Sequence, residues 1–574
     1  MPQSPIDVTD DQIQSALQDV FGLQQFRSRQ SQAIQGVLDK KDVLVTMPTG
    51  EGKSLIYQLP AVVLDGMTLV VSPLIALMKD QVDSLRRRNI RATFVNSSIE
   101  ARQRRERLEA AANREIDLLY VTPERFRSEI FREFLPKLEI RRLAVDEAHC
   151  ISQWGHDFRP DYSRLGEYRK LIGNPPVTAL TATATPSVAA DIVDKLNMDD
   201  PLIIRTGIER ENLFLAATHV NFDDEKTPLI ADRIMAIDGP GIVYSTLIKD
   251  LERLHDELRR RGISTLVYHG ALSPRERKRM QDDFMKSKDR VVLATNAFGM
   301  GVDKEDIRFV LHAQIPKTLE AWTQEVGRAG RDGKPSWCEL FYLQDDIAIQ
   351  QEFVKWANPS IEYVKGVYDT LVRWGERIKS KDVDDLRAEL LHKNRRDNRV
   401  EISLRWMEVL GAIRGSFETC DLEVIDDLDT TLLPEFMQTG DKLRFDLESL
   451  LTMVRFAGDM HTCRRTLLAD HFELTDQPAT CHACDNCVNA EEWVGEQFQP
   501  RPVKEKKREN RSDDRPNESG FNRGDWVKVD RRHLGQVLKV DGNGKSLRLV
   551  VESASDMKRR TVDPSRQSVE KIQN

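Results

Sequence analysis

The sequence has 574 residues, of which 40% are hydrophobic and 31% charged, so it carries enough apolar material for several domain cores. At about 150 residues per domain, this length predicts three to five domains. Asp and Glu number 93 against 85 Lys and Arg, which gives a net charge of −8. That balance argues against a chain coated in nucleic acid and leaves room only for a local basic footprint.

No segment has the pattern of a secretory signal or a membrane span. Residues 1–10 are polar and acidic, without a basic or an apolar region. The apolar stretch 59–78 is interrupted by two prolines, a glycine and an aspartate, which predict buried strands and a helix start. Seven cysteines are too few for a disulfide framework, and four of them lie between 463 and 487. We therefore expect a cytoplasmic protein with a metal site and no membrane partner.

Residues 40–345 alternate between short β-branched runs and amphipathic helical patterns, which is typical of parallel α/β sheets. The pattern restarts after about residue 206, so two α/β domains are predicted, at 1–205 and 206–345. The strands that we expect are 42–47, 68–72, 92–96, 117–122, 142–148 and 177–183 in the first domain, and 241–245, 265–269, 290–295 and 308–312 in the second.

The C-terminal half is predicted to hold four further segments. Residues 346–450 read as a helical insert, in which two helices and a β-prone piece fit either a winged helix or a plain helical bundle. A zinc-binding module is expected at 451–490 and a disordered linker at 491–520. Residues 521–574 alternate apolar and polar side chains between Gly-containing turns, which predicts a small β-barrel resembling a Src-homology-3 domain.

A phosphate-binding loop is predicted at 47–54, MPTGEGKS, between a strand and a helix. The glycines let backbone N–H groups turn toward phosphate oxygens, the lysine supplies a positive charge to the β- and γ-phosphates, and the serine hydroxyl can bind Mg²⁺. Met47 stands where the strict pattern has glycine, so this is the form seen in helicase-type ATPases. The residues expected to bind nucleotide here are Thr49, Gly50, Gly52, Lys53 and Ser54.

Two further motifs complete a nucleotide-hydrolysing set. Asp146 and Glu147 follow an apolar strand, so the first carboxylate can hold Mg²⁺ and the second can deprotonate the attacking water. Arg328 and Arg331, in the stretch 324–333, can stabilise charge on the γ-phosphoryl group as arginine fingers. Because these arginines lie in the second α/β domain, ATP bound between the domains would couple hydrolysis to domain motion.

Together these motifs resemble the RecQ family of DNA helicases, within helicase superfamily 2. The resemblance covers residues 18–345 almost without a gap and resumes at 463–487. It rests on the segments FGLQQFRSRQ (21–30), MPTGEGKS (47–54), VVSPLIALMKDQV (70–82), VTPERF (121–126), DEAHCISQWGHDFRPDY (146–162), ALTATAT (179–185), ATNAFGMGVDK (294–304) and QEVGRAGRDG (324–333).

The resemblance implies two RecA-like domains that use ATP and Mg²⁺, and it assigns roles by position. Gln30 would read the adenine and Arg27 would pack on the base. Arg328 and Arg331 would both face the nucleotide, with Arg331 as the preferred finger. The aromatic-rich loop would couple single-stranded DNA to hydrolysis through Trp154, His156, Phe158 and Arg159, whose rings and charges suit bases and phosphates.

Four cysteines with the spacing C-x17-C-x2-C-x2-C predict a closed, structural Zn²⁺ site of four thiolates. They are Cys463, Cys481, Cys484 and Cys487. The remaining three, Cys150, Cys338 and Cys420, are expected to be buried thiols.

These observations and the resemblance predict an ATP-dependent DNA helicase that unwinds duplex DNA in repair and recombination and is associated with a bacterial-type nucleoid. The resemblance implies that it moves 3′→5′ along single-stranded DNA. The alternatives are an RNA helicase of the same superfamily and a translocase that does not separate strands. The long insert before the zinc module and the barrel after it depart from the family pattern. The barrel is expected to bind a protein partner or nucleic acid.

Overall fold

A computed structural model describes residues 9–27, 29–155, 157–207, 210–299, 302–390, 397–417, 419–474, 480–501, 521, 525–530, 533–541, 547–553 and 559–572. The chain divides into two compact units, Met1–Pro502 and Val503–Asn574, and each is described by itself. Among the described residues, none of the helices combines the length and the apolar character that a membrane span requires.

The first sheet has seven parallel strands in the order β3-β4-β2-β5-β6-β1-β7. Its strands are β1 (Val43–Thr46), β2 (Met67–Val71), β3 (Ala92–Val95), β4 (Leu118–Val121), β5 (Ile140–Val145), β6 (Val177–Thr181) and β7 (Leu202–Arg205). Successive strand residues alternate between two buried apolar clusters, as Val43 and Leu44 do. Both faces of the sheet are therefore covered, as in other parallel sheets.

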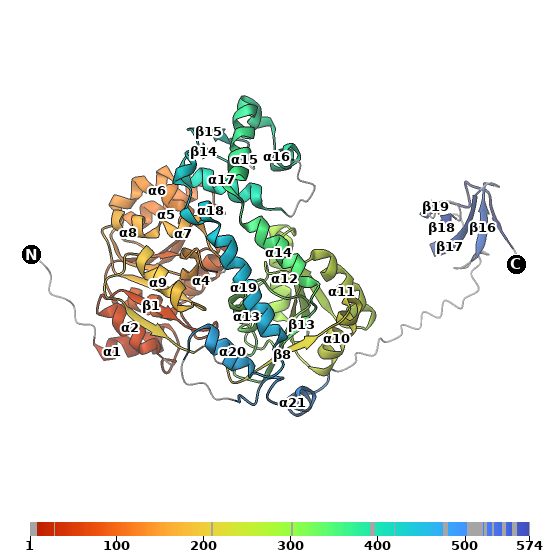
Figure 1. The fold of residues 1–574 in the computed structure, drawn as a ribbon, viewed down its shortest axis with the longest axis horizontal. Coiled ribbons are helices and arrows are strands. Elements are labelled where there is room, and N and C mark those ends of the chain that lie inside the picture. The colour runs from red at the N-terminus through yellow and green to blue at the C-terminus, as the bar shows by residue number, and fades with distance from the viewer. Residues whose placement is uncertain are drawn as a thin grey trace, which may run out of the picture. The chain divides into compact units, whose positions relative to one another are not determined.

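Helices cover both faces of this sheet (Figure 1). The α-helices are α1 (Asp10–Ser15), α2 (Gln30–Leu38), α3 (Leu55–Val63), α4 (Ile75–Arg87), α5 (Ala101–Ala112), α6 (Glu129–Phe134), α7 (Pro160–Ser163), α8 (Leu165–Leu171) and α9 (Pro186–Lys195). Short 3₁₀ or π turns are η1 (Ala16–Val20), η2 (Pro123–Arg127), η3 (Leu135–Lys137) and η4 (Ala148–Ile151).

The second sheet has six parallel strands in the order β10-β11-β9-β12-β13-β8. They are β8 (Leu213–His219), β9 (Gly241–Tyr244), β10 (Thr265–Tyr268), β11 (Val291–Ala294), β12 (Phe309–His312) and β13 (Ser336–Tyr342), and the helices of this lobe are α10 (Asp223–Ala236), α11 (Ile248–Arg260), α12 (Pro274–Lys286), α13 (Leu319–Val326) and α14 (Asp346–Ala357). The predicted boundary near residue 205 thus falls between β7 of the first sheet and β8 of the second.

A helical insert follows α14 and has its own apolar core. Its elements are α15 (Ile361–Trp374), η5 (Gly375–Ser380), α16 (Val383–Glu389), α17 (Arg399–Leu410), β14 (Ile413–Arg414), β15 (Glu423–Val424), η6 (Thr430–Leu432) and α18 (Glu435–Thr439). Helices followed by an antiparallel two-residue ladder match the order predicted for this region. Cys420, expected to be buried, is exposed in the turn between the two short strands.

The chain returns from the insert through α19 (Asp441–Gly458), which packs against α13 and α14 of the second lobe (Figure 1). The helices α20 (Arg464–His471) and α21 (Ala490–Gln497) follow. Residues from α19 and α20 share an apolar cluster with one face of the second sheet, and residues from α21 share the cluster on the other face. The cysteine-rich segment is therefore built onto the second lobe.

The second unit contains five antiparallel strands in the order β19-β18-β17-β16-β20, consistent with the predicted small barrel. They are β16 (Trp526–Val529), β17 (His533–Asp541), β18 (Arg548–Ser553), β19 (Arg559–Val562) and β20 (Val569–Lys571). Alternate residues such as Val527 and Val529 are buried in a common apolar cluster, as the period-two pattern requires. The disordered linker predicted at 491–520 is wrong for its first part, because 491–497 lie in α21, which buries Val494 against the second lobe. Residues 502–520 lie outside the described residues.

Candidate functional site

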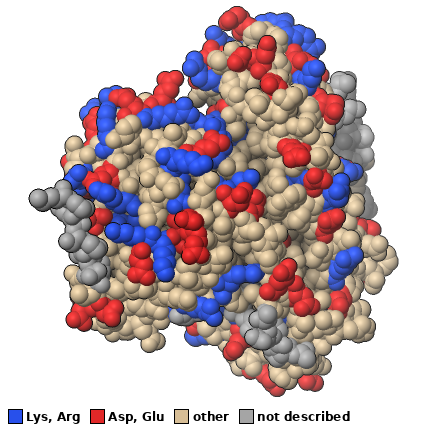
Figure 2. All heavy atoms as spheres, turned by 60° about the vertical axis from the view of Figure 1, so that its left-hand side comes forward, with Lys and Arg blue, Asp and Glu red and all other residues tan. Residues whose placement is uncertain are grey.

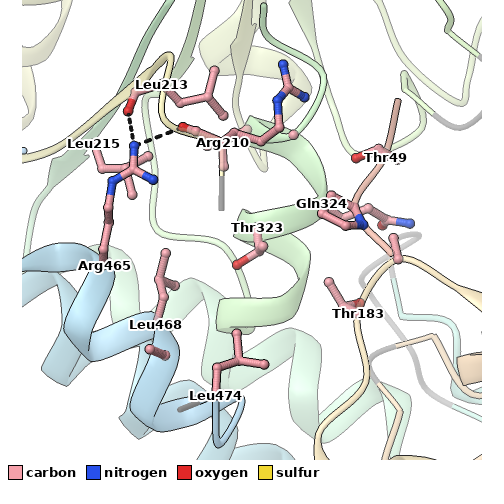
Figure 3. A pocket seen from close by; sticks show the side chains of 15 residues that line it. Thr49, Thr183, Arg210, Leu213, Leu215, Thr323, Gln324, Arg465, Leu468 and Leu474 are labelled. Atoms are coloured by element: carbon pink, nitrogen blue, oxygen red, sulfur yellow. Dashed lines mark hydrogen bonds between the residues drawn. The ribbon is translucent and has the colours of Figure 1, made fainter. Parts of the chain in front are cut away.

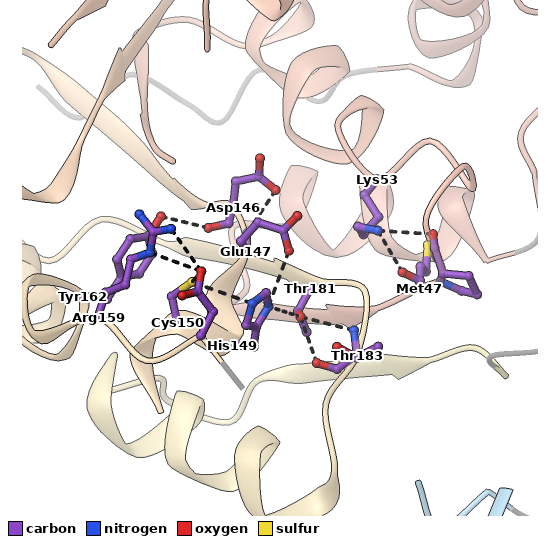
Figure 4. Close-up of polar contacts among 12 residues, drawn as sticks. Met47, Lys53, Asp146, Glu147, His149, Cys150, Arg159, Tyr162, Thr181 and Thr183 are labelled. Carbon is purple, nitrogen blue, oxygen red and sulfur yellow. Dashed lines mark hydrogen bonds and ion pairs between the residues drawn. The ribbon is translucent and has the colours of Figure 1, made fainter. Parts of the chain in front are cut away.

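The phosphate loop joins β1 to α3 at the carboxyl edge of the first sheet. Gly50 and Gly52 have φ angles of +92° and +74°, a region that favours glycine. The ammonium of Lys53 donates hydrogen bonds to the carbonyls of Met47 (2.9 Å) and Pro48 (3.2 Å), as Figure 4 shows. Burial lowers the pKa of Lys53, while the nearby carboxylates act in the opposite direction. The lysine therefore lies inside the loop where phosphate oxygens would need a cation.

Gln30 and Arg27 brace this loop from the N-terminal side. The Gln30 amide nitrogen donates to the carbonyls of Glu51 (2.7 Å) and Gly52 (3.1 Å), and its oxygen accepts from the backbone N–H of Arg27 (2.8 Å). The Arg27 guanidinium donates to the carbonyl of Gly50 at 2.8 Å. Both residues predicted to contact adenine thus lie against the phosphate loop, and their roles in base binding remain predictions.

Asp146 and Glu147 lie at the end of β5, on the same sheet edge as the phosphate loop (Figure 4). Burial, with the neighbouring Glu147 carboxylate, raises the pKa of Asp146 to about 7. A buried carboxyl in this condition is stabilised in its charged form by a cation, so the residue suits Mg²⁺ together with the hydroxyl of Ser54. Glu147 has a left-handed backbone conformation (φ +49°), so the chain leaves the extended direction of β5 at this residue.

His149 connects the carboxylates to the neighbouring strand. Its Nδ1 lies 3.0 Å from Oγ1 of Thr181, at the end of β6, and 3.4 Å from a carboxylate oxygen of Glu147. Burial lowers the pKa of His149 to about 4, so the ring is neutral at pH 7. A hydrogen-bonded contact therefore joins the DEAH segment, 146–149, to the TAT segment that begins at Thr181.

Arg331 of the second lobe lies over the phosphate loop of the first. A Cβ atom placed on Gly50 would be 3.1 Å from Cγ of Arg331, and one on Gly327 would be 2.5 Å from Oγ1 of Thr49. The guanidinium forms an ion pair with Asp303, whose side chain is 82% exposed. The two lobes therefore meet directly at the loop that would hold the phosphates.

Arg328 is engaged within the second lobe. Its guanidinium donates a hydrogen bond to the carbonyl of Gly299 inside the second lobe, and the residue is 4% exposed. Sequence spacing alone treats the two arginines as equivalent, whereas the structure brings only Arg331 to the loop. Arg331 is thus the better placed of the two predicted fingers.

A pocket beside the phosphate loop is lined by both lobes and by α20 (Figure 3). Arg465 of α20 donates to the backbone carbonyls of Arg210 (2.8 Å) and Leu213 (2.9 Å). Arg205, at the end of the first sheet, donates to the carbonyl of Phe472 at 2.7 Å. The zinc segment thus contacts both lobes next to the nucleotide cleft, which no sequence motif indicated.

The aromatic-rich loop follows η4 and has protein partners for both of its rings. Trp154 packs on Phe445 of α19, with ring centroids 5.1 Å apart. Phe158 lies between Trp406 (6.3 Å, stacked) and Phe436 (5.8 Å, edge-on) of the insert. His156, predicted to contact DNA, lies outside the described residues. Both rings are half-buried, and their roles in base binding remain predictions.

Arg159, the fourth residue predicted for DNA, is engaged within the protein. It forms an ion pair with Asp157 (3.0 Å) and donates to the carbonyl of Pro73 (3.1 Å). Asp157 is 3.8 Å from Sγ of Cys150, next to His149 in the chain. Polar contacts thus connect the aromatic-rich loop, through Asp157 and Cys150, to the segment that contains His149.

The four predicted zinc ligands converge on one point. Their sulfur atoms all lie within 4.8 Å of one another, against about 3.8 Å between sulfurs around a tetrahedral zinc ion. Asp485, between Cys484 and Cys487 in the chain, accepts two hydrogen bonds from the Arg464 guanidinium (2.9 and 3.0 Å) and one from the backbone N–H of Ala217 (2.8 Å). This donor set fits zinc, and its supporting contacts anchor the site to β8 of the second lobe.

Family models match three parts of the chain: "DEAD/DEAH box helicase" at 27–192, "Helicase conserved C-terminal domain" at 226–333 and "RecQ zinc-binding" at 428–488. A solved structure of the DEAD-box helicase Mss116 bound to ssRNA and UDP-BeF superposes with a TM-score of 0.50, covering 73% of this chain and 96% of that one at 16% identity. At that identity the similarity concerns the fold alone.

Curated relatives are closer in sequence. The chain is 40% identical over 367 residues to a probable ATP-dependent DNA helicase RecS of Bacillus subtilis, covering 64% of this chain and 74% of that protein. It is 43% identical over 345 residues to the ATP-dependent DNA helicase RecQ of the same species, covering 60% and 58%. The match thus spans three quarters of one relative and less than two thirds of the other. With the three family segments in order, the chain belongs to the RecQ family of ATP-dependent DNA helicases.

Proposed function

We propose that this protein hydrolyses ATP with Mg²⁺ to move 3′→5′ along single-stranded DNA and to separate duplex strands during repair and recombination. The observation that carries the proposal is the position of Arg331 of one lobe over Gly50 in the phosphate loop of the other. A nucleotide bound there would touch both lobes, so its hydrolysis would change how they meet.

The chemistry assigned to the site is an in-line attack of water on the γ-phosphorus. The bond from the γ-phosphorus to the bridging oxygen breaks, ADP leaves, and Glu147 accepts the proton of the water. Lys53 exchanges its loop carbonyls for phosphate oxygens, and Arg331 exchanges Asp303 for the γ-phosphoryl group. Mg²⁺, when bound by Asp146 and Ser54, would supply the charge that neutralises the phosphates.

Exchanging Asp303 for phosphate costs Arg331 little. An ion pair with a carboxylate that is 82% exposed contributes about 0–1 kcal/mol. The arginine can therefore leave it when a more highly charged partner arrives. Lys53 would likewise gain stronger hydrogen bonds from phosphate oxygens, because its present partners are uncharged carbonyls.

DNA is favoured over RNA as the nucleic acid along which the protein moves. Both curated relatives named above are DNA helicases, and the four-cysteine segment matches the RecQ zinc model. On the face shown in Figure 2, basic and acidic side chains are intermixed, as the net charge of −8 suggests. Such a surface suits a motor that must release DNA in each cycle better than a uniformly basic one would.

The test is strand displacement on three substrates: 3′-tailed DNA, 5′-tailed DNA and 3′-tailed RNA. We expect ATP-dependent displacement of the 3′-tailed DNA alone. Equal unwinding of the RNA would contradict the choice of DNA, and displacement from the 5′-tailed duplex would contradict the polarity. ATP hydrolysis stimulated by DNA without any displacement would favour a translocase instead.

For the C-terminal unit we propose a protein-binding role. Trp526, Leu534 and Ile572 are 37%, 42% and 39% exposed, and they lie on neighbouring strand positions around β16. Exposed apolar residues that lie together are typical of interaction surfaces. A chain that ends at residue 520 should keep its DNA-stimulated ATPase activity and should no longer bind a protein partner that the full chain binds. If the Trp526→Ala variant bound that partner as well as the wild type does, this role for the apolar surface would be contradicted.

A further inference from the structure

The helical insert bridges the two lobes at the aromatic-rich loop. It is joined to the second lobe through α14 and α19, and it also contacts the first lobe directly. Glu408 forms an ion pair with Arg127 (2.7 Å), and the carbonyl of Val409 accepts a hydrogen bond from Arg164 (3.4 Å). Both contacts come from the end of α17. The insert is therefore held beside the aromatic-rich loop.

A cavity of about 360 Å³ lies where the insert, the aromatic loop and the second lobe meet. Phe158 and Gly155 contribute from the loop, Lys317 and Asn358 from the second lobe, and Trp406 from the insert. This volume is within the range of ligand-binding pockets, about 300–1,000 Å³. A cavity of this size, whose lining includes charged and aromatic side chains, is unlike a packing defect in an apolar core, which is small and lined by aliphatic side chains.

The charges around the cavity leave one cation available. Lys317 and Lys442 both pair with Asp446, Lys317 at 3.0 Å. Arg405 lines the same cavity from α17, is exposed, and has no acidic or hydrogen-bonding partner among the residues that the structure describes. An unpaired guanidinium that lines the same cavity as the Phe158 and Trp406 rings is a combination that suits a phosphate and its unpaired base.

We infer that the insert forms one wall of the single-stranded DNA path, with Arg405 contacting a backbone phosphate and the cavity beside Phe158 and Trp406 receiving a nucleotide. The inference rests on the proposed function, because it extends the DNA site that the aromatic loop provides. It assigns DNA contact to α17, which lies outside the three regions matched by the family models.

The same loop connects this cavity to the ATP site. Asp157 lines the cavity, pairs with Arg159 and lies 3.8 Å from the thiol of Cys150. Cys150 is 3.7 Å from His149, which contacts Glu147 at 3.4 Å. A nucleotide in the cavity would therefore sit at one end of a continuous set of contacts that reaches the proposed general base.

The test compares Arg405→Ala with Arg373→Ala in the full chain. Arg373 is the matched control because it lies in α15 of the same insert, its side chain is 61% exposed, and it does not line the cavity. Binding to an oligothymidine strand is measured by fluorescence anisotropy over a series of salt concentrations. Loss of one phosphate contact should weaken binding about three- to tenfold and reduce the salt slope by about one. Arg373→Ala should match the wild type, and all three proteins should share the same ATPase rate without DNA.

Photo-cross-linking supplies a second measurement that does not depend on substitution. Single-stranded DNA carrying 5-iododeoxyuridine should cross-link to the α17 segment that contains Trp406 as well as to the aromatic loop. Equal affinity and salt slope for Arg405→Ala and Arg373→Ala, or cross-links that never reach the insert, would overturn the inference while leaving the helicase proposal intact. Tighter binding by Arg405→Ala would also overturn it, since the insert would then obstruct the loop. A wild-type protein that binds no single-stranded DNA would refute both.

Discussion

Replacing Arg331 by alanine should lower the DNA-stimulated ATPase turnover by about 10³-fold or more, because it removes the only guanidinium that the structure brings to the phosphate loop among the two predicted fingers. A 10³-fold loss corresponds to about 4 kcal/mol of transition-state stabilisation. The folded state should be almost unaffected, since the substitution gives up an ion pair with a largely exposed Asp303, worth about 0–1 kcal/mol.

The assay is steady-state ATP hydrolysis at saturating single-stranded DNA, combined with a thermal unfolding scan and a nucleotide-binding titration. Asp303→Ala is the matched control, because it removes the same ion pair and keeps the finger; its turnover should stay within a few-fold of the wild type. Arg331→Lys should not restore activity, since an ammonium lacks the planar fork of the guanidinium. A turnover for Arg331→Ala within tenfold of the wild type would refute this role, as would an equal loss in Asp303→Ala.

The remaining predictions concern a glycine of the phosphate loop, the pH dependence of stability and the binding of zinc. Gly52→Ala should weaken ATP binding at least about tenfold, because a Cβ there would lie 2.7 Å from the side-chain amide that braces the loop, whereas Gly173→Ala carries similar backbone strain (φ +88°) without a neighbour and should bind ATP normally in the same titration. The pKa of His149 is lowered to about 4, below its unfolded value, so protons favour the unfolded chain as the pH falls below about 6.5; about 2 kcal/mol should be lost by pH 5, and the apparent Tm of His149→Gln should depend less on pH than that of the wild type. One zinc ion per chain should be found by metal analysis, and Cys484→Ser should lose it with a lower Tm, while Cys420→Ser, altered at an exposed thiol, should keep both.

Much of the fold could be predicted because its signals are local. The β-branched runs that became β1 and β5 are separated by helical crossovers, and parallel order follows from that alternation. Parallel strands place their carboxyl ends on one edge, so Lys53 and Asp146 could be brought together from sequence alone. The four-cysteine zinc site could be predicted equally well, because two CxxC turns constrain the positions of three sulfurs.

What could not be predicted depends on contacts between residues far apart in the chain. Phe158 and Trp406 are nearly 250 positions apart, and neither carries a pattern that indicates the other. The difference between Arg328 and Arg331 likewise depends on the carbonyl of Gly299 and on how the lobes meet, which spacing cannot reveal. Cys420 was placed in the interior on the general tendency of free thiols, and the position of its turn overrides that tendency.

The central claim is that ATP held between the lobes drives strand separation. It is tested most directly by following ATP hydrolysis and strand displacement together on a 3′-tailed DNA duplex, with wild-type protein and with Lys53→Ala. The account predicts that the wild type hydrolyses ATP and releases the strand in the same reaction, and that Lys53→Ala does neither while remaining folded. Displacement that continues without ATP, or that persists in Lys53→Ala, would contradict it.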